Sequence, residues 1–329
     1  MGTPRRRARL APGLAALRGY RGSWLRGDVL AGLTVAAYLV PQVMAYAALA
    51  GLPPVTGLWA ILAPLLLYAF LGSSRHLSVG PESTTALMTV AVVAPLAGGD
   101  PSRYAALAGT LAVVVGVLCL AAFAARLGFV ADLLSKPILV GYLAGVAVTM
   151  IVGQLGKLTG VPVSGEGIPA ELASFAGQLS RMHPGTTLFA VVVLILLFLG
   201  QARLPKLPTP LFVMLLATAA VVLFDLQRRG IAVVGAVPQG LPTPVLPGVG
   251  DVRDLLLPEI GVLVVGYTDT VLTARAFATR GGYPVDANQE LLALGAANIG
   301  AGLLRGFPIS SSGSRTALGV AAGARTQAY

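Results

Sequence analysis

Apolar residues occur along this chain in long runs, separated by short polar breaks that are rich in glycine and proline. Ten of these runs are long enough to predict helical segments. They cover residues 29–50, 56–72, 82–98, 104–126, 130–152, 186–201, 209–226, 256–278, 288–305 and 313–329. An amphipathic stretch at 168–182 is predicted to lie along a membrane interface. The pattern predicts an all-α polytopic membrane protein.

The composition supports this prediction. Charged residues make up 11% of the 329 residues and hydrophobic residues 56%, with a mean hydropathy of +0.81, whereas soluble domains carry about 25% charged residues. The net charge of +10 arises at segment ends and in residues 1–27, which hold seven arginines and no acid. We interpret residues 1–27 as a cytoplasmic basic segment under the positive-inside rule, and expect no nucleic-acid partner.

A short motif occurs twice, each time after a glycine-, proline- or serine-rich break. Residues 83–87 (Ser-Thr-Thr-Ala-Leu) match residues 314–318 (Ser-Arg-Thr-Ala-Leu) at four of five positions, 231 residues apart (314 − 83). Residues 32–50 align with 261–279 at a similar separation of 229 (261 − 32). Seven predicted segments precede the second copy, and an odd number of crossings reverses its orientation. The pattern therefore predicts an inverted-repeat transporter fold.

This repeat divides the chain into four predicted parts. They are a basic N-terminal segment at 1–27, a first repeat of seven segments at 28–226, a connection at 227–254, and the start of a second repeat at 255–329. Because the second repeat holds three segments where the first holds seven, we expect the chain to be the N-terminal portion of a longer protein, truncated after about ten segments. Segments 56–72 and 82–98 are short for a straight span, and 82–98 follows a glycine-proline break, which is typical of a discontinuous helix. We expect discontinuous half-helices of this kind at the substrate site.

Hydroxyl side chains at the start of two helices predict an anion-binding site. The first N–H groups of a helix are unpaired, and the positive end of its dipole attracts anions. Ser83 and Thr84 lie at one helix start, and Ser314, Arg315 and Thr316 at the other. An arginine inside an apolar region indicates a functional site, since its guanidinium can bind an oxyanion through two parallel hydrogen bonds. The alternative is a structural ion pair of this arginine with an acidic residue such as Asp269.

Two acidic residues accompany this predicted site. Glu82 directly follows the glycine-proline break. Its carboxylate either stabilises a helix start, or must be protonated before an anion can bind, which would link transport to protons. Asp269 lies in the middle of segment 256–278, and Thr273 shares its helix face one turn further on. A carboxylate with a nearby hydroxyl suits Na⁺, whereas an isolated carboxyl suits H⁺.

Five ordered motifs in the chain resemble the sulfate permease (SulP) family of anion transporters. They lie at 39–47, 51–58, 72–81, 286–291 and 306–316. The resemblance extends over residues 25–329. It implies two inverted repeats of seven segments, a core domain that moves against a gate domain, and a C-terminal STAS domain. On this reading the STAS domain and the last four segments are absent from the chain.

The resemblance also assigns roles to individual residues. It implies that Gln42 and Tyr46 line the substrate pocket, next to Pro41, which is predicted to open the first helix. It places an arginine at the substrate site at position 315, and links an acid at position 269 to cation coupling. The run at 269–273 (Asp-Thr-Val-Leu-Thr) is similar to the sodium-dependent bicarbonate members, which lack an equivalent of the arginine. The coupling ion, H⁺ or Na⁺, is left open.

These features predict secondary active transport of an inorganic anion, with sulfate as the default substrate, by alternating access. The alternatives are a sodium-dependent bicarbonate transporter and an uncoupled anion exchanger or channel. No enzyme, cofactor or metal site is expected, apart from Na⁺ at Asp269 and Thr273, because the two histidines lie far apart and no nucleophile motif is present. We expect a multi-pass protein in the lipid bilayer of the cell membrane, with a cytoplasmic N-terminus and a homodimeric full-length form.

Overall fold

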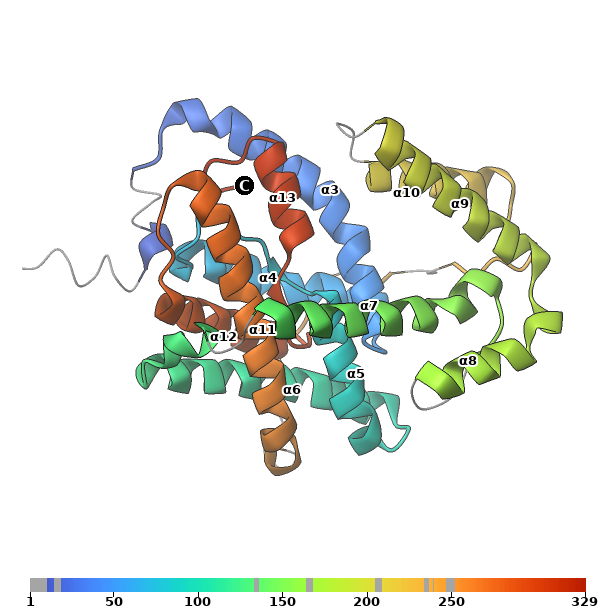
Figure 1. The fold of residues 1–329 in the computed structure, drawn as a ribbon, viewed down its shortest axis with the longest axis horizontal. Coiled ribbons are helices and arrows are strands. Elements are labelled where there is room, and N and C mark those ends of the chain that lie inside the picture. Colours follow the sequence, from blue (N-terminus) through green and yellow to red (C-terminus); the bar gives the residue numbers. More distant parts are fainter. Residues whose placement is uncertain are drawn as a thin grey trace, which may run out of the picture. The chain divides into compact units, whose positions relative to one another are not determined.

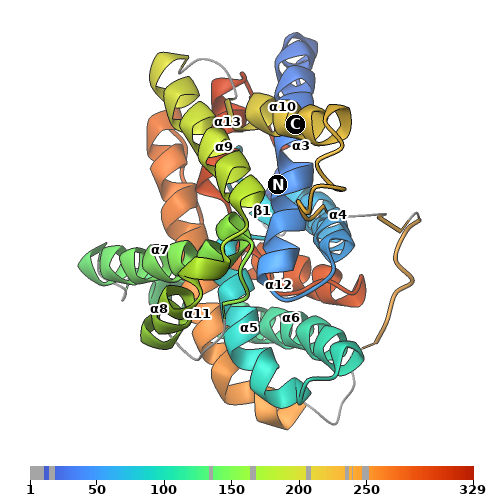
Figure 2. The same cartoon turned by 90° about the vertical axis from the view of Figure 1, so that its right-hand side faces the viewer.

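The structure, a computed structural model, describes residues 11–14, 19–132, 136–163, 168–204, 209–233, 237–238, 240–246 and 252–329. The chain forms two compact units, one of Met1–Leu134 with Val237–Tyr329 and the other of Ser135–Ala236. Both units are mostly helical (Figures 1 and 2). The arginines of the basic segment before residue 11 lie outside the described residues, as do parts of the predicted connection at 227–254.

Each of the ten predicted segments contains one helix, so the prediction of an all-α fold is confirmed. The first unit contains η1 (Gly22–Trp24), α3 (Leu25–Leu49), α4 (Pro54–Leu71), β1 (Val79–Gly80), α5 (Ser83–Ala97), α6 (Pro101–Ala124), η2 (Leu127–Asp132), α11 (Val252–Gly281), α12 (Ala287–Leu303), β2 (Ser310–Ser311) and α13 (Gly313–Ala321). The second unit contains α7 (Lys136–Thr159), α8 (Ile168–Gly177), η3 (Leu179–Arg181), α9 (Pro184–Arg203) and α10 (Thr209–Leu223).

Helix length separates two groups of apolar helices. Among the described residues, five helices are long and apolar enough to cross a membrane, at Gly22–Leu49, Pro54–Leu71, Pro101–Ala124, Pro184–Arg203 and Pro258–Gly281. The helices α5 and α13 have only 15 and 9 residues. At a rise of about 1.5 Å per residue, neither reaches the roughly 30 Å of a hydrocarbon core. Their length agrees with the prediction of half-helices.

The helix α12 is largely buried and packs against α6 and α4 (Figure 1). Glycines allow the backbones of α6 and α12 to approach closely. A Cβ atom at Gly116 would lie 2.6 Å from the backbone oxygen of Gly295, and one at Gly302 would lie 2.5 Å from that of Gly109. Close contacts of this kind between small residues are how helices associate inside membranes.

A buried carboxylate joins the start of α12 to the loop after α4. Glu290 is fully buried, and its oxygens accept hydrogen bonds from the Tyr68 hydroxyl (2.7 Å), the Ser73 amide (2.9 Å) and the Ser73 hydroxyl (2.6 Å). Three donors satisfy this carboxylate, so it can remain in the interior without a cation. The motif at 286–291 therefore has a structural role in this unit.

The segment predicted at 313–329 ends earlier than expected. The helix α13 stops at Ala321, and Gly323 adopts a left-handed backbone with φ of +99°. The Gly323 amide donates to the Val320 oxygen, and the Ala324 amide donates to the Gly319 oxygen. A left-handed glycine with hydrogen bonds of this kind terminates a helix, which is why the apolar run does not continue as one.

The residues after α13 return to the start of α3. Asp28 is only 1% exposed, and it accepts hydrogen bonds from the amide of Arg325 (2.6 Å) and from the amide and hydroxyl of Thr326 (3.3 and 2.8 Å). The Gln327 side chain donates to the Ser74 backbone oxygen (3.0 Å). These bonds hold the end of the chain against α3 and the loop after α4.

Candidate anion-binding site

Two short strands bring the two copies of the sequence motif together. β1 and β2 pair antiparallel, with Val79 opposite Ser311 and Gly80 opposite Ser310. β1 leads into α5 and β2 leads into α13. The two helices leave the paired strands in opposite directions (Figures 1 and 2). Two helix starts that are about 230 residues apart in the sequence therefore lie at one place in the fold.

Arg315 lies in the first turn of α13 and is completely buried. Its Nε donates to the Ser78 hydroxyl (3.2 Å), and its Nη1 donates to the Pro81 backbone oxygen (2.8 Å) and to Oε1 of Gln42 (3.1 Å). Its Nη2 has no hydrogen-bond partner in the described part of the chain. The three acceptors are neutral, so the guanidinium is held in place while its charge is not cancelled by a contacting carboxylate.

The helix α3 contributes Gln42 and a tyrosine one turn away on each side. Nε2 of Gln42 donates to the hydroxyls of Tyr38 and Tyr46, both at 3.2 Å, while its Oε1 faces Arg315. The helix is continuous through Pro41, so the predicted opening at this proline is wrong. A single proline removes one backbone hydrogen bond, and neighbouring helices can keep the rest of the helix intact.

The two helix starts are capped by different chemical groups. At α5, the Glu82 carboxylate accepts a hydrogen bond from the Thr84 amide (2.6 Å) and another from the Ser83 hydroxyl. At α13, the Ser312 hydroxyl accepts from the Arg315 amide (3.4 Å). A carboxylate brings a negative charge to the positive end of the helix dipole, and a hydroxyl does not. The chain thus supplies its own anion at α5 but none at α13.

The other hydroxyls at the start of α13 differ in their environments. Ser314 is exposed, and its hydroxyl lies 3.2 Å from that of Ser312. The buried Thr316 hydroxyl accepts from the Ser78 amide (3.0 Å) and donates to the Ser312 backbone oxygen (2.7 Å). The bond from Ser78 holds the loop before β1 against α13, and the bond to Ser312 lies within the first turn of α13. Its side chain therefore positions the site, while Ser314 is open to a ligand.

The helix α11 places the predicted coupling residues beside β2. Oδ2 of Asp269 accepts a hydrogen bond from the Ser311 hydroxyl (2.8 Å). Thr273 faces the first residue of α13, because a Cβ atom at Gly313 would lie 3.9 Å from its Cγ2. The predicted anion ligands and the predicted coupling residues are therefore brought together around the paired strands.

Three serines at this site were missed in the sequence. Ser78 contacts Arg315, Ser311 contacts Asp269, and Ser312 caps α13. The sequence repeat could not reveal them, because a shift of 231 aligns Ser312 with a proline and Ser311 with a glycine. The run of three serines at 310–312 inside an apolar region was the available signal. Among the described residues, no group of three or more metal-ligating side chains of His, Cys, Asp or Glu is found.

Two short helices that start at a pair of antiparallel strands define a class of polytopic membrane protein with a carrier-type fold. Residues 25–329 match the model of the sulfate permease family. The chain belongs to this family. The "Probable sulfate transporter MT1781" of Mycobacterium tuberculosis (strain CDC 1551 / Oshkosh) is 57% identical over 321 residues, which cover 97% of this chain and 57% of that protein. The chain thus spans little more than half the length of this relative.

Solved structures show the same fold. Murine Solute Carrier 26 family member A9, described as an anion transporter in the inward-facing state, is similar with a TM-score of 0.88 and 27% identity, over 97% of this chain and 56% of that chain. The transmembrane domain of a cyanobacterium bicarbonate transporter, BicA, is similar with a TM-score of 0.84 and 22% identity, over 94% and 80%. The predicted fold class is confirmed, and relatives that are membrane transporters point away from an enzyme.

Proposed function

We propose that the protein containing this chain carries an inorganic anion, sulfate by preference, across a cell membrane by alternating access. The observation that carries this proposal is the state of Arg315, which is buried and held by neutral groups, while its Nη2 finds no hydrogen-bond partner among the described residues. A buried guanidinium with a free edge is costly unless it meets an anion. The 57% identity to a protein named as a sulfate transporter supports sulfate as that anion.

The start of α13 is the part of the site that suits an incoming anion best. The amides of Gly313 and Ser314 are in the first turn, and the cap contributes no negative charge. The exposed Ser314 hydroxyl adds a further donor. Helix starts with free amides bind oxyanions without any need for a specific side chain. We place the anion there, with Arg315 supplying the positive charge and Gln42 and Tyr46 forming the opposite wall.

We propose that Glu82 couples anion transport to protons. Its carboxylate holds the amide and hydroxyl donors at the start of α5, and it repels an anion that approaches the same donors. Protonation would remove that charge, so an anion and a proton would bind together and travel in the same direction. Coupling to Na⁺ is the competing proposal, with Asp269, Ser311 and Thr273 as its oxygen ligands.

Uptake of labelled sulfate into proteoliposomes that contain the full-length protein tests these proposals, with proton and sodium gradients imposed separately. We expect an inward proton gradient to drive sulfate accumulation. Accumulation driven only by sodium would move the coupling to Asp269 and Thr273. Sodium-driven uptake of bicarbonate without sulfate uptake would overturn the choice of substrate. Uptake of neither anion under any gradient would overturn the transport proposal itself.

Orientation and assembly are proposed on physical grounds. Basic residues gather at the end of the first unit where α3 begins, including Arg21 and Arg26, and the positive-inside rule places this end in the cytoplasm. We also propose a homodimer for the full-length form. Cysteine labelling from each side of the membrane tests the orientation, and cross-linking in the membrane tests the dimer.

A further inference from the structure

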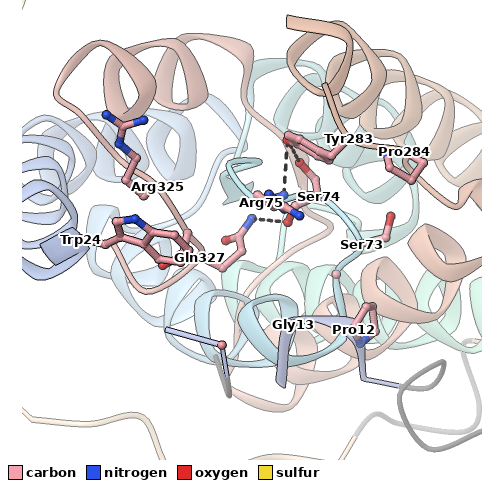
Figure 3. A pocket seen from close by; sticks show the side chains of 13 residues that line it. Pro12, Gly13, Trp24, Ser73, Ser74, Arg75, Tyr283, Pro284, Arg325 and Gln327 are labelled. Atoms are coloured by element: carbon pink, nitrogen blue, oxygen red, sulfur yellow. Dashed lines mark hydrogen bonds between the residues drawn. The ribbon is translucent and has the colours of Figure 1, made fainter. Parts of the chain in front are cut away.

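A cavity of about 460 Å³ lies at the end of the first unit where α3 begins (Figure 3). It is lined by residues 12, 13 and 19, by Trp24 of η1, by the loop after α4, by the loop between α11 and α12, and by the loop after α13. Its lining shares no residue with the Arg315 site. The side chains that matter for its chemistry are those of Trp24, Arg75, Tyr283, Arg325 and Gln327.

Hydrogen bonds fix the wall of this cavity. The Ser74 hydroxyl lies 3.1 Å from that of Tyr283, and the Arg75 amide donates to the same Tyr283 hydroxyl (3.3 Å). The Gln327 side chain donates to the Ser74 backbone oxygen (3.0 Å). Figure 3 shows Tyr283 and Gln327 turned towards Ser74 from different segments. The cavity is therefore a formed structure and not a gap between loose loops.

Two guanidinium groups give the cavity its charge. The Arg75 guanidinium lies 5.2 Å from the ring centre of Tyr283, a cation–π contact that positions it without reducing its charge. The Arg325 side chain is exposed, while its backbone amide is held by Asp28. In the described part of the chain neither guanidinium forms an ion pair. His76, beside Tyr283, adds no charge at neutral pH, because burial lowers the pKa of its imidazole.

The acidic groups at this end of the unit are already occupied. Asp28 accepts three hydrogen bonds from Arg325 and Thr326. Glu290 accepts three from Tyr68 and Ser73. The Asp286 carboxylate accepts from the first amides of α12. None of the three forms an ion pair with Arg75 or Arg325 among the described residues, so both exposed guanidiniums are open to an external anion.

The size and lining of the cavity select the kind of anion. Its volume falls in the range of pockets that hold small organic ligands, and it exceeds what a bare tetrahedral oxyanion fills. Trp24, Pro12 and Pro284 add apolar surface beside the two guanidiniums. Guanidinium groups bind phosphate oxygens in pairs. We propose that this cavity binds a phosphate ester, with Arg75 and Arg325 on the phosphate and Trp24 against the organic part.

Two sources could supply this chemistry, namely the headgroup of an anionic phospholipid and a soluble phosphate ester. The position of the cavity favours neither source. Tryptophan is common at membrane interfaces, which suits a lipid headgroup, and the basic end is proposed to face the cytoplasm, which suits a soluble ester. A bound phosphate would link the loop that carries Ser78, a contact of Arg315, to the loop that follows α13. A ligand in the cavity would therefore hold in place the two loops that flank the Arg315 site.

Tryptophan fluorescence of the purified full-length protein tests this proposal, because Trp24 lines the cavity. The probes are glycerol 3-phosphate, dioctanoyl phosphatidylglycerol and inorganic phosphate, and the signal is the part of the change that Trp24→Phe removes. We expect saturable binding of glycerol 3-phosphate or of the lipid, and weaker binding of inorganic phosphate. Saturation by the soluble ester alone identifies that source, and saturation by the lipid alone identifies a headgroup.

Variants of the two arginines separate a site from general attraction. We expect Arg75→Ala and Arg325→Ala each to weaken binding about tenfold, with Arg75→Lys intermediate because lysine keeps the charge but not the paired donors. Arg280→Ala is the matched control, since this exposed arginine lies at the same end outside the cavity. Equal weakening by Arg280→Ala, or no saturable change with any probe, would overturn the proposal. Thermal unfolding of each variant checks its fold, and the readout does not depend on transport.

Discussion

The starts of α5 and α13 derive from similar sequences but differ in charge. The α5 start is capped by the carboxylate of Glu82, and the α13 start by the hydroxyl of Ser312. A shift of 231 aligns Glu82 with Gly313, and Thr84 with Arg315. The residue before the first copy of the motif thus adds a negative charge to the site, and Arg315 in the second copy adds a positive one.

This difference teaches that the two halves of the site are suited to different tasks. A helix start with free amides and a guanidinium attracts anions, whereas a helix start that is capped by a carboxylate repels them until the carboxylate is protonated. In our proposal the start of α13 binds the anion, and the protonation state of Glu82 at the start of α5 controls whether the anion can bind.

Replacing the positive charge at α13 is expected to have the largest effect. Arg315→Ala should reduce labelled sulfate uptake by proteoliposomes at least about 100-fold, because the guanidinium is the only charged group proposed to hold the anion. Arg315→Lys should restore little, since an ammonium cannot reach Ser78, Pro81 and Gln42 together.

Arg305→Ala serves as the control for this loss of one arginine. Its side chain is exposed and contacts Thr243, away from the paired strands. Normal thermal unfolding must accompany the loss of uptake in the Arg315 variants for the effect to be assigned to the site. Sulfate uptake by a folded Arg315→Ala protein within twofold of the unchanged protein would disprove its role.

Removing the negative charge at α5 should alter the pH dependence of transport. In our proposal the ionised Glu82 carboxylate opposes the anion, so uptake falls as the external pH rises. Glu82→Gln is neutral at every pH, and should raise sulfate uptake at alkaline pH several-fold, towards the rate at acid pH. Asp100→Asn, which changes the carboxylate cap of α6, should leave the profile unchanged. A Glu82→Gln profile identical to that of the unchanged protein would rule out this coupling.

Asp269 tests whether coupling belongs to α11 and not to α5. If Asp269 couples transport to protons or to sodium, Asp269→Asn should abolish the stimulation of sulfate uptake by that ion's gradient. Exchange of sulfate across the membrane should continue. Ser311→Ala, which removes its hydrogen-bond donor, should have the same effect in weaker form. Uptake should be measured under proton and sodium gradients in turn. If both gradients still drive accumulation in Asp269→Asn, coupling lies elsewhere.

The smallest effect concerns the neutral cap of α13. Ser312→Ala should lower the free energy of unfolding by about 1 kcal/mol, the usual contribution of a hydroxyl cap. Ser314→Ala, with an exposed hydroxyl that does not cap the helix, should change it by less than about 0.5 kcal/mol. Thermal unfolding in one detergent compares the two variants. An equal loss from both would show that Ser312 is not the cap that matters.

Much of the architecture could be predicted from local sequence. Apolar runs predicted ten helices, and a glycine-proline break predicted the short α5, because chain length and hydrophobicity are properties of a segment. The end of α13 at Ala321 was not predicted, since a left-handed Gly323 and the capture of the following amides by Asp28 depend on a distant helix. The repeats at 28–226 and 255–329 stay a prediction.

The order of amino acids alone predicted a helical membrane protein that resembles the sulfate permease family, and it singled out Arg315, Glu82 and Asp269. The hydrogen-bond partners of Arg315 and Asp269 follow from the packing of distant segments. Arg315 donates a hydrogen bond to Gln42, which is 273 residues away in the sequence, and Asp269 accepts one from Ser311, which is 42 residues away. A buried polar group takes its partners from whichever segments pack around it, so its hydrogen bonds follow from the fold and not from its neighbours in sequence.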